Sequence, residues 1–351
     1  MANKRSINTN LMKKLETFRV MALGEAMNTP ILLIGVPGVA KTQAVIDYAK
    51  ASLPSGHIND DDLFLLETDE GTRSNAIKGN IDLEELTLNQ KYKVISPITS
   101  AKIVIINEID KASASLRNSL LGVMNERILF NGNEKVPCMW TNFVATCNSI
   151  PDDEKDSPFW DRFLVTFNVE RLNQTDILSY YNAGGKDFTQ THDIDVPTPA
   201  DVANVKIDPI KLKKAIDIIY TDLSDRSLTF LPRLIKNVMI VWSMSEQRAI
   251  VKTVELLVGK EKAVQVSKVL VPKEFRELLD TIDVLGQSVN NEEYNKQYDK
   301  IEGLFNSLRS QNKLTEDDMV DIKNAINSQE DKLPFLKVEE EQAEEALEAF
   351  S

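Results

Sequence analysis

Short, largely apolar segments alternate with helical patterns along the first half of the chain. Such segments are typical of strands that are buried on both faces of a parallel sheet. Four of them occur, at residues 31–36, 63–67, 103–106 and 141–147. Apolar residues at helical spacing predict helices at residues 9–27, 42–53 and 113–127. Strands that alternate with helices predict an α/β doubly wound domain over about residues 1–170.

Two shorter patterns predict β-hairpins that are inserted into this domain. Residues 78–97 contain a Gly-Asn turn signal after the second predicted strand. Residues 128–137 contain Asn-Gly between apolar flanks, which is a strong short-range hairpin signature.

The second half of the chain is expected to be mainly helical. Gly, Asp, Thr and Pro are frequent in residues 182–208, which predicts a loop. Helical spacing then follows in three segments, at residues 211–220, 232–244 and 249–258. We therefore predict a small all-α domain over residues 171–272, and further helices with an acidic tail over residues 273–351.

The composition argues against several classes of protein. Lys and Arg number 41 and Asp and Glu number 54, a net charge of −13, so we expect no nucleic-acid partner. Two cysteines and two histidines are too few for a Cys/His zinc site or a disulfide framework. The longest apolar run, residues 31–36, is too short to span a membrane, and the basic N-terminus lacks the apolar region of a secretory signal. We expect a cytoplasmic protein without a membrane partner.

A glycine-rich turn follows the first predicted strand and opens a helix. Small residues in a tight turn let backbone N–H groups point at a phosphate chain. Lys41 would supply a cation at the β- and γ-phosphates of ATP, and Thr42 a hydroxyl ligand for Mg²⁺. The alternative is a turn whose Lys-Thr pair is accidental, but strand, turn and helix all fall where the motif requires them. The predicted nucleotide-binding residues are Gly35, Val36, Pro37, Gly38, Val39, Ala40, Lys41 and Thr42.

A second candidate element ends the third predicted strand. Asn107 and Glu108 follow the apolar residues 103–106 directly. A carboxylate at the end of a buried strand beside a phosphate-binding loop lies near Mg²⁺ and the attacking water. Glu108 is therefore the candidate base that polarises this water. By itself the pattern fits equally a strand that merely ends in polar residues, and its pairing with the glycine-rich turn favours the functional interpretation.

These motifs resemble those of AAA+ ATPases, and more narrowly those of the MoxR/RavA-like group in the helix-2-insert branch. The resemblance covers about residues 10–270. It implies a P-loop AAA+ core with a parallel sheet and β-hairpin insertions, followed by an all-α lid. Ala is common before the P-loop Lys in this group, although the strict motif has Gly. The segments that carry the resemblance are GVPGVAKT, IVIINEIDKASASLRNSLLGVMNERILFNG, FVATCNSIP and FWDRFLV.

The resemblance also implies catalytic roles for three residues. Asn148 matches sensor 1, which positions the attacking water together with Glu108. Arg162 matches the arginine finger, which reaches the nucleotide of a neighbouring subunit. Arg233 matches sensor 2 on the lid, although Arg226 lies only seven residues away. The structural alternatives are a strand-end cap for the Asn, a surface ion pair for the first Arg and a helix-terminal role for the second.

Further expectations concern the hairpins. In this branch the two hairpins face the ring pore or a partner, so Phe130, Leu88 and Tyr92 near their tips are candidates for substrate contact. The alternative is that these side chains pack on their own domain. Arg127, just before the second hairpin, either acts across a subunit interface or holds the hairpin in place.

Asn107 departs from the family pattern, which usually has Asp at this position beside the metal. Asn keeps a carbonyl acceptor but loses the charge. A hydrogen bond to a charged group is worth about 1.5–3 kcal/mol and a neutral one about 0.5–1.5 kcal/mol, so the loss is about 1–2 kcal/mol. We therefore predict roughly tenfold weaker binding of Mg²⁺-nucleotide and slow but real hydrolysis.

The function implied by the resemblance is ATP hydrolysis in a ring, which we expect to be a homo-hexamer. Nucleotide-driven motion would remodel or mature a protein substrate in a chaperone-like way. In this group the partner is often a protein with a von Willebrand factor A domain. One alternative is a nucleotide-gated scaffold with little turnover, which Asn107 favours. Another is a DNA-remodelling AAA+ ATPase, against which the acidic balance argues.

Overall fold

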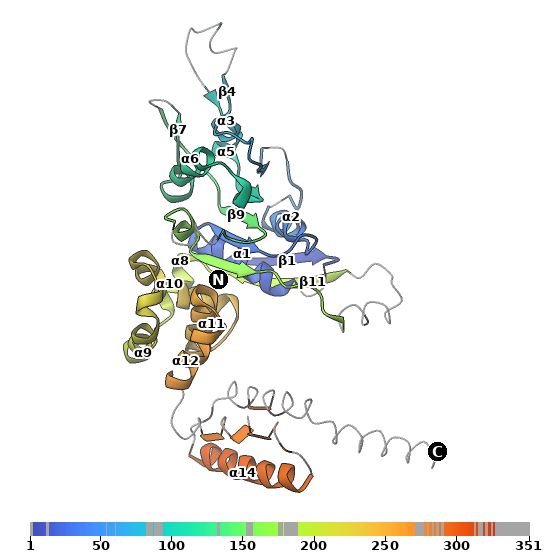
Figure 1. Ribbon diagram of the computed structural model, residues 1–351, viewed down its shortest axis with the longest axis vertical. Helices are drawn as coiled ribbons and strands as arrows, with labels where there is room; N and C mark the ends of the chain where they lie inside the picture. The colour runs from blue at the N-terminus through green and yellow to red at the C-terminus, as the bar shows by residue number, and fades with distance from the viewer. Residues whose placement is uncertain are drawn as a thin grey trace, which may run out of the picture. The chain divides into compact units, whose positions relative to one another are not determined.

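The computed structural model describes most of the first 270 residues and part of the remainder (Figure 1). The described residues are 3–11, 14–53, 55–59, 61–81, 87, 94–131, 134–151, 157–174, 178 and 189–270, then 277–278, 281–282, 284–285, 288, 291–311, 314, 319, 322–323 and 326. The chain divides into two compact units. One comprises residues 1–212 and 219–263, and the other residues 213–218 and 264–351. The division into domains at residues 170 and 272 stays a prediction.

A five-stranded parallel sheet forms the centre of the first unit. Its order is β10-β2-β9-β6-β3. All four predicted strands are confirmed, and β6 and β9 are buried along their whole length, as continuous apolar runs require. The prediction that residues 63–67 are buried on both faces is wrong, because β3 lies at the edge of the sheet and leaves Leu65 43% exposed. The fifth strand was not predicted because it has only four residues, two of them polar. The strands are β2 (Ile31–Ile34), β3 (Leu63–Glu67), β6 (Ile103–Asn107), β9 (Asn142–Cys147) and β10 (Val165–Asn168).

Helices connect the strands and complete the α/β architecture. The predicted helices at 42–53 and 113–127 are confirmed as α2 and α6. The helix predicted at 9–27 begins only at Leu15, because residues before it form a strand. The elements are α1 (Leu15–Met27), α2 (Lys41–Ser52), α3 (Asn75–Lys78), α5 (Pro97–Ser100), α6 (Ala114–Asn125) and the 3-10 turns η1 (Ile109–Lys111) and η3 (Trp160–Arg162).

A second, two-stranded sheet joins distant parts of the chain. Strand β1 (Asn3–Thr9) pairs antiparallel with β11 (Gln190–Val196). The prediction of a loop over residues 182–208 is therefore wrong where the structure describes it, since α8 (Pro199–Asn204) follows β11. Ile194 and Val196 of β11 are buried, but the other residues of the strand are polar. The apolar alternation is therefore too short to identify a strand within a segment rich in turn-forming residues.

Both predicted hairpins are confirmed as antiparallel strand pairs. Strand β4 (Asn80–Ile81) pairs with β5 (Val94–Ile95), and β7 (Ile128–Asn131) pairs with β8 (Glu134–Pro137). Figure 1 shows β4 and β7 at the same end of this unit, next to α3 and α6. The predicted tip residues Leu88 and Tyr92 lie outside the described residues.

Helices follow β11, as predicted, and two of them pack on the sheet domain. Helix α10 is longer than the prediction of 232–244, because Ser224 caps its N-terminus and Pro232 is accommodated inside it. The indole N–H of Trp242 donates to the Glu16 carboxylate at the start of α1, at 3.0 Å. The helices are α9 (Pro209–Ile219), η4 (Tyr220–Asp222), α10 (Asp225–Val241), α11 (Glu246–Val258) and α12 (Lys260–Leu270).

The second unit has a small apolar core of its own. It includes α14 (Asn291–Ser310), whose Ile301 and Leu308 are buried. Leu278, Ile282 and Ile322 pack in the same cluster. Within the described part of the whole chain, no helix has the length and apolar character needed to cross a membrane.

Candidate nucleotide site

The glycine-rich turn lies at the carboxyl end of β2 and leads into α2. Gly38 adopts a φ of +84°, which glycine allows at little cost. A Cβ on Gly35 would lie 2.8 Å from the carbonyl oxygen of Val169, so glycine is needed there for the close approach of the chain after β10. Ala40 has a φ of +59°, a left-handed conformation that costs a residue with a side chain about 1–2 kcal/mol. This conformation explains why the strict motif has glycine at the Ala40 position.

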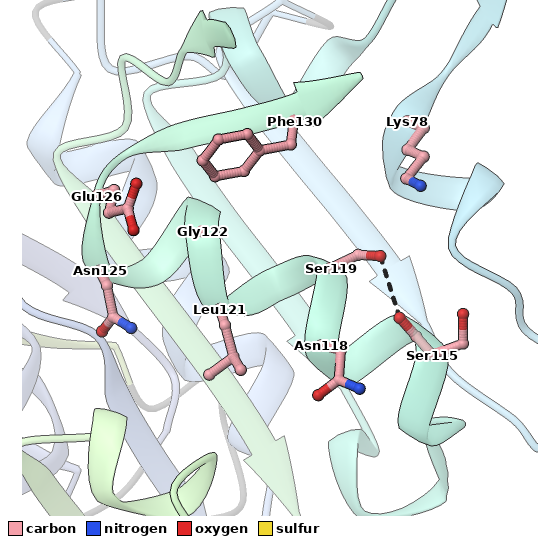
Figure 2. Close-up of a pocket in the computed structure, with 9 residues that line it drawn as sticks. All are labelled: Lys78, Ser115, Asn118, Ser119, Leu121, Gly122, Asn125, Glu126 and Phe130. Carbon is pink, nitrogen blue, oxygen red and sulfur yellow. Dashed lines mark hydrogen bonds between the residues drawn. The ribbon is translucent and has the colours of Figure 1, made fainter. Parts of the chain in front are cut away.

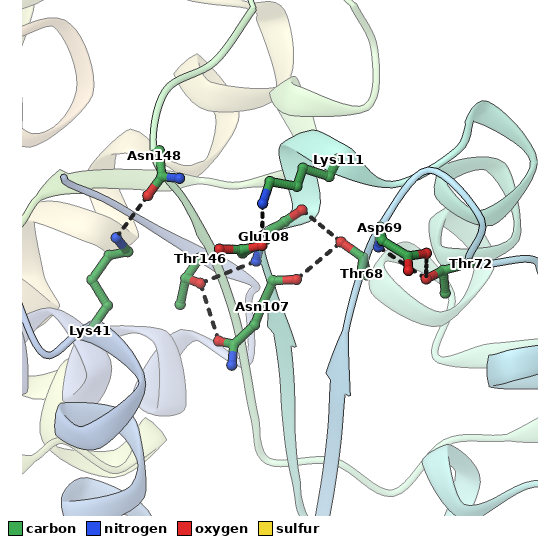
Figure 3. Close-up of polar contacts among 9 residues, drawn as sticks. All are labelled: Lys41, Thr68, Asp69, Thr72, Asn107, Glu108, Lys111, Thr146 and Asn148. Carbon is green, nitrogen blue, oxygen red and sulfur yellow. Dashed lines mark hydrogen bonds and ion pairs between the residues drawn. The ribbon is translucent and has the colours of Figure 1, made fainter. Parts of the chain in front are cut away.

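Lys41 connects the turn to the end of the neighbouring strand β9. Its Nζ donates to the carbonyl oxygen of Gly35 at 2.5 Å. It also donates to Oδ1 of Asn148 at 3.3 Å, a contact that Figure 3 shows. Burial lowers the pKa of Lys41, and the nearby Cys147, Asp110 and Glu108 oppose that shift. The ammonium group is thus held between the phosphate-binding turn and the predicted sensor 1 residue.

Asn107 lies at the centre of a cluster of hydroxyl groups. Its side-chain oxygen accepts hydrogen bonds from the Thr42 hydroxyl and from the Thr146 hydroxyl, each at 3.1 Å. The residue is only 7% exposed. Thr146 was not predicted. The signal that would have found it is the sheet register, in which Ile106 pairs with Ala145 and the next residues of both strands are therefore neighbours.

Glu108 follows Asn107 in a left-handed conformation, with a φ of +56°. Three hydrogen bonds hold its backbone: the Thr68 hydroxyl donates to its carbonyl oxygen at 2.6 Å, the Lys111 N–H donates to the same oxygen at 2.8 Å, and its own N–H donates to the Thr146 hydroxyl at 3.4 Å. Its carboxylate forms an ion pair with Lys111, with 2.6 Å between Oε2 and Nζ. Neither Thr68 nor Lys111 was predicted to belong to the site.

A single pocket gathers these groups. The structure thus brings together the predicted Lys41, Thr42, Asn107, Glu108 and Asn148. It adds Glu67, Thr146 and Cys147, and neither Arg162 nor Arg233 is in its lining. The lining residues are Pro37, Gly38, Val39, Ala40, Lys41, Thr42, Gln43, Glu67, Asn107, Glu108, Thr146, Cys147 and Asn148.

The oxygen groups of this pocket suit Mg²⁺ when it arrives with a nucleotide. Mg²⁺ takes oxygen ligands and is commonly bound by one or two protein groups together with substrate phosphates. Thr42 offers a hydroxyl and Asn107 an amide oxygen 3.1 Å from it. In the described part of the chain, no three His, Cys, Asp or Glu residues are grouped so that they could hold a metal by themselves. The donor set therefore fits a metal that shares its ligands with phosphates.

Comparison with known proteins places this site in a family. A family model described as the MoxR domain in the MoxR-vWA-beta-propeller ternary systems matches residues 1–206. The chain belongs to this MoxR family. The MoxR-type AAA+ fold expected from the sequence motifs is thereby confirmed.

Individual proteins are similar to parts of this MoxR chain. The uncharacterized protein MJ0812 of Methanocaldococcus jannaschii is 28% identical over 236 residues, which cover 64% of this chain and 61% of that protein. The structural protein ORF618 of the Acidianus two-tailed virus is 30% identical over 146 residues, 41% of this chain and 23% of that one. The MoxR chain thus spans less than two thirds of the length of these relatives.

A solved structure shows the same fold. The crystal structure of a proposed ATPase from Cytophaga hutchinsonii matches with a TM-score of 0.53 and 16% sequence identity. The match covers 74% of the MoxR chain and 90% of the Cytophaga chain.

Two arginines of the MoxR chain lie close together away from the nucleotide pocket. Burial lowers the pKa of Arg226 in α10, and the positive charge of Arg162 in η3 lowers it further. Nη1 of Arg226 and Nε of Arg162 are buried without a hydrogen-bond partner. Arg233 instead lies on the exposed face of α10. Arg226, the alternative to Arg233 in the sequence analysis, is therefore the arginine of α10 that lies near Arg162.

Arg127 of the MoxR chain holds the second hairpin to its domain. It has a φ of +55°, and its carbonyl oxygen accepts from the N–H of Cys138 at 2.7 Å. Its guanidinium lies 4.0 Å from the centre of the Trp140 ring and donates to Oδ1 of Asn28 at 3.1 Å. These contacts favour the structural alternative for Arg127.

A second hollow of the MoxR chain lies between α6 and the hairpin strand β7 (Figure 2). A Cβ on Gly122 would lie 3.0 Å from the ring of Phe130, so glycine lets this ring approach α6. Phe130 nevertheless stays 42% exposed. The side chain both packs on its own domain and remains available, so its contact with a substrate stays a prediction. The hollow is lined by Lys78, Ser115, Asn118, Ser119, Leu121, Gly122, Asn125, Glu126 and Phe130.

Proposed function

We propose that this MoxR chain binds Mg²⁺-ATP and hydrolyses it to ADP and phosphate. The observation that supports this proposal is the meeting of Lys41, Thr42, Asn107, Glu108 and Asn148 in one pocket. Each of these groups has a distinct task in phosphoryl transfer, and an accidental turn would not gather all of them.

The residues of the pocket divide the work between binding and proton transfer. Lys41 leaves the carbonyl oxygen of Gly35 and binds the β- and γ-phosphates, with Thr42 at the metal. Mg²⁺, when bound, neutralises charge that develops on the phosphates. Glu108 and Asn148 hold the attacking water. As the water oxygen bonds to the γ-phosphorus, the bond to the bridging oxygen of ADP breaks, and a water proton passes to the Glu108 carboxylate.

Asn107 makes this site weaker than one with Asp. Its amide oxygen already accepts from Thr42 and Thr146. Its amino group can only donate, so it offers no acceptor to metal-bound water. This arrangement supports slow turnover, and it is also the feature that favours the second candidate function, a nucleotide-gated scaffold that binds ATP with little hydrolysis.

We further propose that the chain assembles into a homo-hexameric ring, in which Arg162 reaches the nucleotide of the next subunit. An arginine supplied by a neighbour stabilises charge on the transferring phosphoryl group. The unpartnered nitrogens of Arg162 and Arg226 support a shared anion-binding role across the interface, with Arg226 preferred to Arg233 as the lid arginine. The ring would remodel a protein substrate in the cytoplasm. The family description supports a partner with a von Willebrand factor A domain.

The test is Mg²⁺-ATP turnover over a range of protein concentrations, with Glu108→Gln as the control. Specific activity that rises with concentration and disappears in the variant supports a hydrolase with shared sites. In that case Arg162→Ala should abolish turnover while nucleotide binding persists. Turnover equal to that of Glu108→Gln at every concentration, despite nucleotide binding, would refute hydrolysis and leave the scaffold.

A further inference from the structure

The ion pair between Glu108 and Lys111 lies at the position where the proposed base must act. Lys111 Nζ is 2.6 Å from Oε2 of Glu108, and the two side chains are 49% and 36% exposed. Glu108 lines the nucleotide pocket. One of its two carboxylate oxygens is therefore paired with an ammonium group (Figure 3).

The backbone builds this contact into the fold. The left-handed conformation of Glu108 starts the 3-10 turn Ile109–Lys111, and the Lys111 N–H closes the turn on the Glu108 carbonyl at 2.8 Å. The turn returns the Lys111 side chain to the carboxylate three residues earlier. The hydroxyl of Thr68, the residue after strand β3, donates to the same carbonyl. The pair thus follows from the local geometry rather than from a chance meeting of two long side chains.

Lys111 also has other acidic groups within its electrostatic reach. Its pKa is raised, first by the hydrogen bond to Glu108 and more weakly by the charges of Asp110 and Glu67. Glu67 ends strand β3 and lines the same pocket. Lys111 therefore stays charged, and Asp110 and Glu67 are the other acidic groups near it when the ion pair opens. An exposed ion pair is held weakly, so it can open repeatedly during turnover.

We propose that Lys111 is a positioning residue that restrains the Glu108 carboxylate, so that Glu108 accepts a proton from water less readily while the ion pair is closed. This inference rests on the proposed ATPase function. The restraint lowers basal hydrolysis, because a carboxylate oxygen paired with an ammonium group is a poorer acceptor for the water proton. It leaves nucleotide affinity largely unchanged, because Lys111 does not line the pocket.

The experiment compares kcat and KM for Mg²⁺-ATP in the full chain, in four single variants and in the double variant Lys111→Met/Glu108→Gln. Lys111→Met removes the charge at similar length, and Lys111→Arg keeps it. Lys206→Met is the control for loss of an exposed lysine elsewhere, and Glu108→Gln reports the background. We expect Lys111→Met to raise kcat about two- to fivefold at unchanged KM, the range that opening a weak surface pair allows. Lys111→Arg and Lys206→Met should stay within about 1.5-fold of the parent in kcat.

The outcomes separate this inference from the function on which it rests. Glu108-dependent turnover in the parent, with kcat in Lys111→Met unchanged or reduced and the melting temperature preserved, would overturn the restraint alone. A rise in kcat that persists in the double variant Lys111→Met/Glu108→Gln would also overturn it, since the effect must pass through Glu108. Turnover that is independent of Glu108 in the parent and in Lys111→Met would overturn the ATPase function as well.

Discussion

Asn107→Asp should make the thermal stability of the chain depend on Mg²⁺-nucleotide. The substitution changes one amide nitrogen to oxygen at a position that is 7% exposed. The new carboxylate would accept the two hydroxyl hydrogen bonds that Asn107 now accepts at 3.1 Å. The change therefore adds a negative charge without changing the shape of the side chain. Its effect on stability depends on whether Mg²⁺ is present to balance that charge.

The expected magnitudes follow from these contacts. Burying a carboxylate costs several kcal/mol, and strengthening two hydrogen bonds from neutral to charge-assisted recovers about 1 kcal/mol each. A net cost of about 1–3 kcal/mol remains without metal, which lowers the melting temperature by about 2–4 °C per kcal/mol in a unit of this size. With Mg²⁺-ATP, the carboxylate orients metal-bound water, and affinity should rise about tenfold, or about 1.4 kcal/mol.

Thermal unfolding in EDTA and in excess Mg²⁺-nucleotide, with nucleotide affinity measured over a Mg²⁺ titration, tests this reasoning. Asn107→Asp should melt below the parent in EDTA and show a larger upward shift with Mg²⁺-nucleotide. Asn142→Asp is the matched control, because Asn142 is a 3% exposed amide at the opposite end of β9. It should be destabilised equally in both conditions. An equal loss for Asn107→Asp in both conditions, with an unchanged Mg²⁺ midpoint, would refute the placement of Asn107 at the metal.

Three further results are expected. Ala40→Gly should raise the free energy of unfolding by about 1 kcal/mol, because it relieves a φ of +59°. The control Ala51→Gly, near the end of the helix that Ala40 precedes, should lower that free energy by about 0.5–1 kcal/mol. Denaturant unfolding measures both changes. Thr68→Val should lower kcat more than it raises KM in steady-state turnover, because its hydroxyl no longer holds the two carbonyl oxygens at the end of β6. The pKa of Tyr48 is raised well above 10 by burial and by Glu25, so the unfolded chain loses this proton first, and stability should fall as the pH rises above 10. Tyr48→Phe should flatten that fall in melting temperature between pH 9 and 11, and an unchanged slope would contradict the assignment.

The parts of the fold that the sequence predicted are those in which the local pattern decides the structure. Four strands of the central sheet were predicted from largely apolar segments, and two of them, β6 and β9, are buried along their whole length. The hairpin at 128–137 was predictable because its Asn-Gly signal falls where β7 ends, whereas Gly79 of the other hairpin precedes β4 and does not mark the turn between its two strands. The candidate nucleotide site was predictable for a related reason. Asn107, Glu108 and Asn148 directly follow predicted strands, and parallel strands bring such ends to one edge. Lys41 and Thr42 open the helix that follows another of these strands.

The parts that sequence analysis missed depend on contacts between distant segments. Strand β1 pairs with β11, so that Ser6 donates to Asp193 across 187 positions of the chain. Each strand alone is largely polar, and neither indicates its partner. Thr68 and Thr146 entered the site in the same way, since only the sheet order puts them beside the end of β6. Periodicity reports burial, and it does not report which polar residue lies opposite another.

Backbone conformation explains why sequence motifs predicted the site, whereas the conformational preferences of single residues would not have predicted it. Ala40 and Glu108 are two of the described residues other than glycine with positive φ, and both line the pocket. Ala and Glu are poor choices for a left-handed conformation, which costs each of them about 1–2 kcal/mol. Each one directly precedes a helical turn that carries a lysine of the site: α2 begins at Lys41, and η1 ends at Lys111. The strained conformation of Glu108 therefore begins the turn that carries Lys111, the residue proposed to restrain it. We expect a change at Lys111 to alter kcat with little effect on the stability of the fold.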